Sequence, residues 1–201
     1  MKKTINIKKL VIGSALVASV VATPLTAFAA NDSKNTTING IIGSVISMTT
    51  LSTVTLNVTP VSGGSQTSAS DTVAVSTNNA TGYNLTLADS DATTSLVKGG
   101  DTIAAHAGTQ AVPTVLANNT WGYAVGGVGG FDATYAVLSN VTSSTTKWAG
   151  MPATGAANLL KTTAATASAD PTTVWYAVKA DTTKPNGTYA DTVTYTASTN
   201  P

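Results

Sequence analysis

The stretch NGTYADTVTYTA, residues 186–197, alternates between two kinds of side chain almost without interruption. Successive side chains of an extended chain point to opposite faces, so Tyr189, Val193 and Tyr195 share one face and threonines occupy the other. Asp191 also falls on the mainly apolar face. This period of two predicts a β-strand with one buried side.

The strand that this stretch predicts follows TTVWYAVKA, residues 172–180, through the turn-forming sequence DTTKPNG, residues 181–187. Consecutive strands joined by a short turn usually pair with each other. We therefore expect residues 186–197 to pair with residues 172–180 and to complete the protein's own core, rather than to be donated to a neighbour.

Similar short runs recur along the chain, separated by loops rich in Gly, Pro and Ser. The predicted strands are residues 38–48, 52–58, 71–77, 83–89, 120–125 and 135–138. Whether residues 71–77 and 83–89 form a hairpin or one continuous strand stays open, as does the choice between strand and short helix for residues 157–167. Residues 88–119 are expected to be mostly irregular.

The amino-acid usage agrees with strands rather than helices. Thr, Val, Ser, Asn and Gly are abundant, whereas Glu and Arg, both good helix formers, are absent. The chain also has no Cys, so its fold must be held by packing without disulfides. We predict an all-β fold, specifically an Ig-like antiparallel β-sandwich of Greek-key type.

The N-terminus has the pattern of a cleaved secretory signal peptide. Four lysines lie among the first nine residues, an apolar run covers residues 10–22, and Ala27 and Ala29 are the small residues before a cleavage site. The apolar run is shorter than the roughly 20 residues that a membrane-spanning helix needs. The predicted organisation is a signal peptide at 1–29, a flexible polar stem at 30–37 and one β-sandwich domain at 38–201.

Removal of the signal peptide changes the charge balance. Four of the ten lysines leave and all nine aspartates remain, so the exported chain has a net charge near −3 (6 − 9). No basic patch is left for nucleic acid or for an anionic membrane. We expect an extracellular protein without a membrane span in its mature chain, retained at a bacterial cell surface.

Candidate chemistry is sparse. His106 is the only histidine, and no Gly-x-Ser-x-Gly motif accompanies it, so we expect no enzymatic activity and no cofactor. Asp89 and Asp91, together with Asp101, are weak candidates for calcium ligands. The complete calcium-loop motif is missing, so we expect no metal site and interpret this stretch as a solvated acidic loop.

The three tryptophans, Trp121, Trp148 and Trp175, are candidate surface contacts that would stack on sugar rings if they are exposed. In residues 172–180, the alternation places Trp175 opposite an aliphatic and aromatic face. If that face is buried, Trp175 lies on the surface.

Two segments resemble the motifs of the WxL-domain proteins of Gram-positive cell surfaces. TGYNL matches the first motif at Gly82, Tyr83 and Leu85, and the terminal GTYADTVTYTASTNP matches the second at Tyr195 and Ala197. Tyr replaces Trp in both motifs, and Ala replaces the second Leu. The resemblance implies an Ig-like sandwich held non-covalently on peptidoglycan or on partner surface proteins, with Tyr83 and Tyr195 as possible contact residues.

These features predict an exported, non-enzymatic cell-surface protein with a structural or interaction role, non-covalently associated with a cell-wall polymer or with other surface proteins. Two alternatives remain. The apolar segment within residues 36–48 would let the protein self-assemble as a pilus or surface-layer subunit, by adding a strand to a neighbour's sheet edge. The tryptophans instead favour a carbohydrate-binding adhesin module.

Overall fold

The computed structural model describes residues 31–201, and every regular element in this range is a β-strand. The strands are β1 (Ile46–Thr49), β2 (Ser65–Thr77), β3 (Tyr83–Asp89), β4 (Leu96–Lys98), β5 (Asp101–Ala105), β6 (Thr114–Val115), β7 (Thr120–Ala124), β8 (Leu138–Val141), β9 (Lys147–Trp148), β10 (Asn158–Thr162), β11 (Ala167–Ala180) and β12 (Val193–Thr199). The all-β prediction is confirmed. The predicted signal peptide lies outside the described residues.

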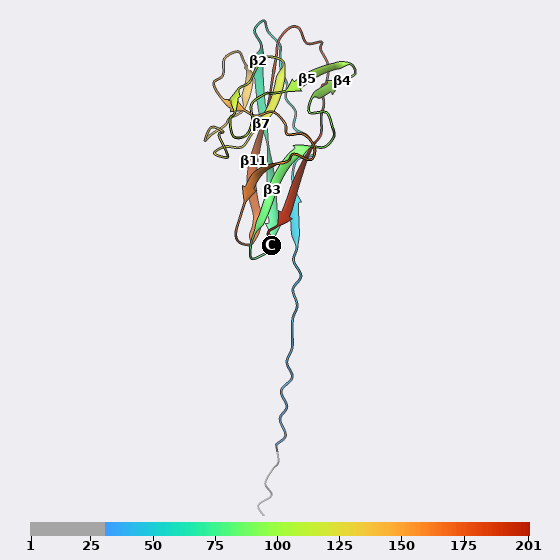
Figure 1. The fold of residues 1–201 in the computed structure, drawn as a ribbon, viewed down its shortest axis with the longest axis vertical. Helices are drawn as coiled ribbons and strands as arrows, with labels where there is room; N and C mark the ends of the chain where they lie inside the picture. Colours follow the sequence, from blue (N-terminus) through green and yellow to red (C-terminus); the bar gives the residue numbers. More distant parts are fainter. Residues whose placement is uncertain (1–30) are drawn as a thin grey trace, which may run out of the picture. The chain divides into compact units, whose positions relative to one another are not determined.

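The larger sheet has the strand order β1-β2-β11-β7-β5-β4, and β8 also pairs with β2. The long strands β2 and β11 form its centre and run side by side along almost their whole lengths (Figure 1). Most pairs are antiparallel, but β5 and β7 are parallel. The sheet is therefore mixed, in contrast to the wholly antiparallel arrangement that we predicted.

A smaller sheet has the order β10-β3-β12, and β6 and β9 form a separate two-stranded ribbon. The inward side chains of both main sheets belong to one hydrophobic core, in which Leu85 and Leu87 of β3 are fully buried together with Val73 and Val75 of β2. Polar groups also link the two sheets within this core. The hydroxyl groups of Tyr176 in β11 and Tyr195 in β12 are hydrogen-bonded at 2.7 Å.

The predicted partner of the terminal strand was wrong. β12 pairs with β3 in the smaller sheet, where Tyr195 lies opposite Leu87. The backbone turns after β11, with the Lys184 N–H donating to the Asp181 carbonyl, but residues 185–192 then continue past β4 instead of returning along β11. A backbone bridge between Ala190 and Val97 marks this crossing.

The two alternatives left open by the sequence are both decided. β2 and β3 are separate strands of different sheets, so residues 71–89 form neither a hairpin nor one continuous strand. Residues 158–162 are strand β10, and the helical alternative is excluded. The irregular region predicted at residues 88–119 contains three short strands that lack a clear alternation: β4, β5 and β6.

Two predicted N-terminal strands are largely absent. Of residues 38–48, only the last three belong to β1, and Ile38, Ile41 and Ile42 are exposed. Residues 52–58 keep the predicted alternation of half-buried and exposed side chains, but they are not a regular strand. Side-chain hydrogen bonds hold this segment instead, including one from the Thr67 hydroxyl to the Asn57 carbonyl at 3.0 Å.

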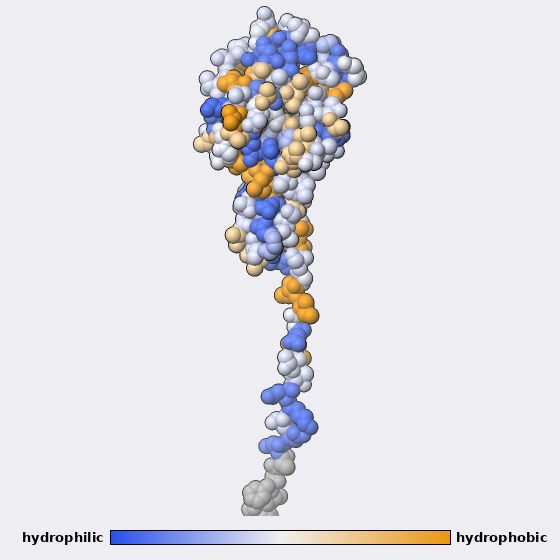
Figure 2. All heavy atoms as spheres, viewed as in Figure 1, coloured by the Kyte–Doolittle hydropathy of each residue, from blue (hydrophilic) through white to orange (hydrophobic). Residues whose placement is uncertain are grey.

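Residues 42–201 form one compact unit. On the face shown in Figure 2, most of the surface of this unit is hydrophilic or neutral, and its apolar atoms lie in small separate groups. Residues 31–41 belong to a different unit, contain no strand or helix, and have exposed side chains.

Candidate functional site

The pairing of β12 with β3 brings together acidic residues that are far apart in the sequence. β3 ends at Asp89, and the antiparallel register places Asp89 opposite Val193. Asp191 precedes Val193 by two residues, and the Ser90 N–H donates to the Thr192 carbonyl at 3.0 Å. The loop after β3 and the segment before β12 therefore meet at one end of the smaller sheet.

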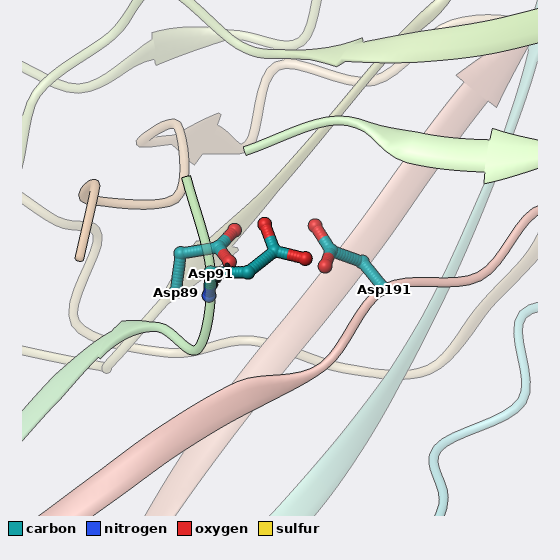
Figure 3. A group of neighbouring side chains, drawn as sticks. All are labelled: Asp89, Asp91 and Asp191. Carbon is teal, nitrogen blue, oxygen red and sulfur yellow. Dashed lines mark hydrogen bonds between the residues drawn. The ribbon is translucent and has the colours of Figure 1, made fainter. Parts of the chain in front are cut away.

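Three carboxylates gather at this end. One oxygen each from Asp89, Asp91 and Asp191 lies within 4.8 Å of the other two. Figure 3 shows the three carboxyl groups turned toward one another, two from the end of β3 and its loop and one from the opposite segment. We call this group the aspartate cluster.

Backbone N–H groups fix one oxygen of each carboxylate in the aspartate cluster. The Asp91 N–H donates to Asp89 Oδ1 at 3.0 Å, and the Thr93 N–H donates to Asp91 Oδ1 at 2.6 Å. The Thr192 N–H donates to Asp191 Oδ1 at 2.7 Å. The orientation of all three groups is therefore set by the backbone.

The second oxygens have a different environment. The Asp89 side chain is 1% exposed, and neither Asp89 Oδ2 nor Asp191 Oδ2 has a hydrogen-bond partner within residues 31–201. Buried carboxylate oxygens without partners are costly unless an opposite charge or a proton compensates them.

The environment raises the pKa of the Asp191 carboxyl to about 6. Burial is the largest cause, and the hydrogen bond from the Thr192 N–H acts in the opposite direction. The negative charges of Asp89 and Asp91 add to the increase, as does the hydrogen bond that the protonated Asp191 carboxyl makes with the Asp89 carboxylate. Close carboxylates cannot all carry a free negative charge at low cost, so the cluster favours either a proton or a cation.

Two members of the calcium candidate set predicted from the sequence belong to this cluster, and the third does not. Asp101 lies on β5 and forms an ion pair with Lys98 at 3.1 Å. Asp191 takes the third position and was missed, because its proximity to Asp89 depends on long-range pairing. The sequence feature that could have indicated Asp191 is its position on the otherwise apolar face of the predicted terminal strand.

The tryptophan candidates are corrected by their burial. Trp121 is 3% exposed and Trp148 is fully buried, so neither ring is accessible to a sugar. The indole of Trp121 donates to the Thr94 carbonyl at 2.9 Å, and the ring of Trp148 packs edge-on against Tyr135 with centroids 5.1 Å apart. Trp175 is half-buried and packs against the hydrophobic core.

The two tyrosines of the motif-like segments are also core residues rather than surface contacts. Tyr83 is fully buried, and its hydroxyl donates to Asp170 at 2.8 Å. Tyr195 is partly buried against Tyr176. Both face inward because they occupy the apolar positions of alternating strands.

His106 is buried and has a local structural role. Its Nε2 lies 2.8 Å from the Thr114 hydroxyl, and the Ala117 N–H points to its Nδ1 at 3.4 Å. Burial lowers the pKa of the imidazole, so it is neutral near pH 7. These contacts bind the histidine to the following loop of its own chain.

Comparisons with known proteins give no relative. No protein-family model matches the chain, and neither the curated proteins nor the solved structures contain a significant match. Within residues 31–201, no helix has the length and apolar character required to cross a membrane.

Proposed function

We propose that this chain is an exported, non-enzymatic protein of the bacterial cell surface, with a structural or interaction role and a non-covalent association with the wall. The observation that carries the proposal is an apolar segment ahead of β1 that is left exposed. Ile38, Ile41 and Ile42 are 85%, 95% and 88% exposed. Large β-branched side chains are normally buried, so an exposed group of them is typical of an interaction surface.

The proposal includes an Ig-like Greek-key sandwich as the finer description of the fold. Two crossings between the sheets support it. The chain passes from the larger to the smaller sheet between β2 and β3, and again between β11 and β12. The parallel pair of β5 and β7 would then be a local departure from the antiparallel pattern.

Membership of the WxL-domain group is part of the same proposal. The two motif-like segments lie on neighbouring strands, and Ala197 of β12 is directly opposite Leu85 of β3. If the two motifs form one binding surface in this family, they have to lie on adjacent strands, as these two segments do. This membership would make peptidoglycan or other surface proteins the partners.

A surface-polymer subunit is the second candidate, and it is favoured by the same exposed isoleucines. β12 is an edge strand of the smaller sheet, and an apolar segment from another copy is a suitable partner for such an edge. Electron microscopy of the purified protein would show filaments or lattices in this case. The carbohydrate-binding alternative has lost most of its basis because two of its three tryptophans are buried.

The test is to express the chain with its own N-terminus in a Gram-positive bacterium and to compare cells with medium by immunoblot. Wild type is compared with a triple variant, Ile38→Ser, Ile41→Ser and Ile42→Ser. The matched control is Thr36→Ser with Thr37→Ser, in the same exposed segment.

We expect wild type and the control to stay with the cells and the triple variant to shift to the medium. Equal retention of all three proteins would refute a role for the exposed isoleucines. Accumulation of all three inside the cells would refute export itself.

A further inference from the structure

We propose that the aspartate cluster, formed by Asp89, Asp91 and Asp191, is a Ca²⁺ site that joins the end of β3 to the segment before β12. The inference rests on the geometry of this cluster and does not depend on where the protein is retained.

The first argument is the uncompensated charge of a buried group. Asp89 is almost completely buried, its Oδ2 accepts no hydrogen bond from residues 31–201, and Figure 3 shows its carboxyl group directed into the cluster. The lysine–aspartate ion pairs in this part of the chain are Lys34–Asp32, Lys98–Asp101 and Lys161–Asp170. None of these lysines pairs with a member of the cluster, so a bound cation is the natural counter-charge.

The second argument is that backbone hydrogen bonds already orient the carboxylates of the cluster. A backbone N–H holds Oδ1 of each carboxylate, which leaves Oδ2 of each group available to a cation. Two oxygens that bind the same Ca²⁺ each lie 2.3–2.6 Å from it. Carboxylate oxygens within 4.8 Å of one another, as in this cluster, can therefore share one ion.

The chemistry of the ligands selects the metal. Three carboxylates without His or Cys suit a hard cation and disfavour Zn²⁺ or Cu²⁺. Ca²⁺ accepts six to eight oxygens in flexible geometry, so water would complete its coordination, whereas Mg²⁺ requires a near-ideal octahedron at about 2.0–2.1 Å. Carboxylates from two separate backbone segments fit Ca²⁺ better than Mg²⁺, because Ca²⁺ tolerates a wider range of coordination geometries.

A bound Ca²⁺ would also explain why an acidic residue occupies the apolar face of the terminal run. It would neutralise the mutual repulsion of the carboxylates and fix Asp191 against β3, adjacent to the hydrogen bond between Ser90 and Thr192. The ion would therefore hold the start of β12 in its register.

The experiment measures thermal unfolding by circular dichroism during titration of the chelator-treated protein with CaCl₂ or MgCl₂. The variants are Asp91→Asn and Asp191→Asn, and the matched control is Asp101→Asn, which removes the same charge outside the cluster. Asp91 is exposed, so its variant is expected to fold even if Asp191→Asn does not.

For wild type, we expect Ca²⁺ to raise the melting temperature with an apparent Kd of about 10⁻⁴ to 10⁻³ M, as in extracellular calcium modules. Asp91→Asn and Asp191→Asn should weaken this affinity at least about tenfold, because the site loses a charged ligand. Asp101→Asn should behave as wild type, and Mg²⁺ should have a much smaller effect.

Three results would overturn the assignment. The first is an unchanged melting temperature of wild type at 10 mM CaCl₂. The second is an unaltered Ca²⁺ response in a folded Asp91→Asn variant, which would place the ion elsewhere. The third is an equal response to Mg²⁺, which would refute calcium as the specific ligand.

Discussion

Asp191 shows how one residue can connect a strand pattern to a candidate site. Its position within the alternating run turns its side chain to the same face as Tyr189 and Val193, where an acid is unexpected. Because β3 ends at Asp89 beside this position, the acid meets other acids rather than apolar groups. The one acidic residue on the apolar face of the run therefore marks the position of the aspartate cluster.

The raised pKa of Asp191 predicts a particular pH dependence in the absence of cations. The folded state keeps this proton up to about pH 6, whereas the unfolded chain releases it near 3.8. The folded state binds more protons in this window, so stability falls as pH rises from about 4 to about 6. Asp89 and Asp91 are the charged groups that face Asp191.

The measurement is urea unfolding in chelator at pH 4.5 and pH 7, for wild type and Asp191→Asn. Wild type should lose about 1 kcal/mol more than the variant between these pH values, after allowance for solvent screening of a partly exposed group. Identical pH profiles for the two proteins would contradict the shifted pKa.

The hydrogen bond between the hydroxyls of Tyr176 and Tyr195 predicts a second effect at the residue scale. Tyr195→Phe removes one partner and leaves the buried Tyr176 hydroxyl unpaired, which should cost about 1–3 kcal/mol. The double variant, with Tyr176→Phe added, should recover part of this loss. A double variant destabilised by the full sum of both single changes would show that the bond contributes nothing.

At the scale of the element, alternation predicted which side of a strand is buried better than it predicted the strand's partner. Val174, Tyr176 and Val178 are buried in the core, as the pattern indicated, whereas Trp175 between them is only half-buried. Side-chain periodicity is a local property and follows directly from backbone geometry. The sheet that a strand joins depends on contacts between distant segments, so the pairing of β12 with β3 was not predictable from one sequence.

The N-terminal region shows a second limit of the same kind. Residues 38–45 have the β-branched composition of a strand, yet within residues 31–201 no neighbouring strand pairs with them. A composition that favours strands is not sufficient, because a strand requires a partner for its backbone groups. The aspartate cluster was predicted only in part for a related reason: two of its members are close in the sequence and the third is remote.

The role of β12 in the core leads to a prediction for truncation. Deletion of residues 193–201 leaves one edge of β3 unpaired, because β12 pairs with that edge, and it removes Val193 and Tyr195, which pack against the core. Burial of large apolar side chains is worth roughly 1.5–3 kcal/mol each, a substantial fraction of the about 5–15 kcal/mol that stabilises a domain.

The truncated protein should therefore be unfolded or aggregated, as measured by circular dichroism and protease sensitivity. A matched control is deletion of residues 31–37, which form no strand and are exposed. A truncated chain that stays folded, and that binds the missing peptide in trans, would instead assign the strand to a partner molecule.

At the scale of the whole molecule, the proposal joins three features: an N-terminal pattern for export, an all-β fold without disulfides, and exposed isoleucines ahead of β1. Each feature by itself is compatible with several functions. Together they favour a protein that works outside the cell through contacts with a polymer or with other proteins, and they make the mode of its attachment the decisive property.

The most direct test of this central proposal is antibody labelling of intact source cells before and after a wash with a chaotropic salt. We expect labelling of unpermeabilised cells and loss of the label after the wash, because non-covalent attachment depends on burial and hydrogen bonds that chaotropes weaken. Labelling only after permeabilisation would contradict surface display, and retention of the protein after boiling in detergent would contradict non-covalent attachment.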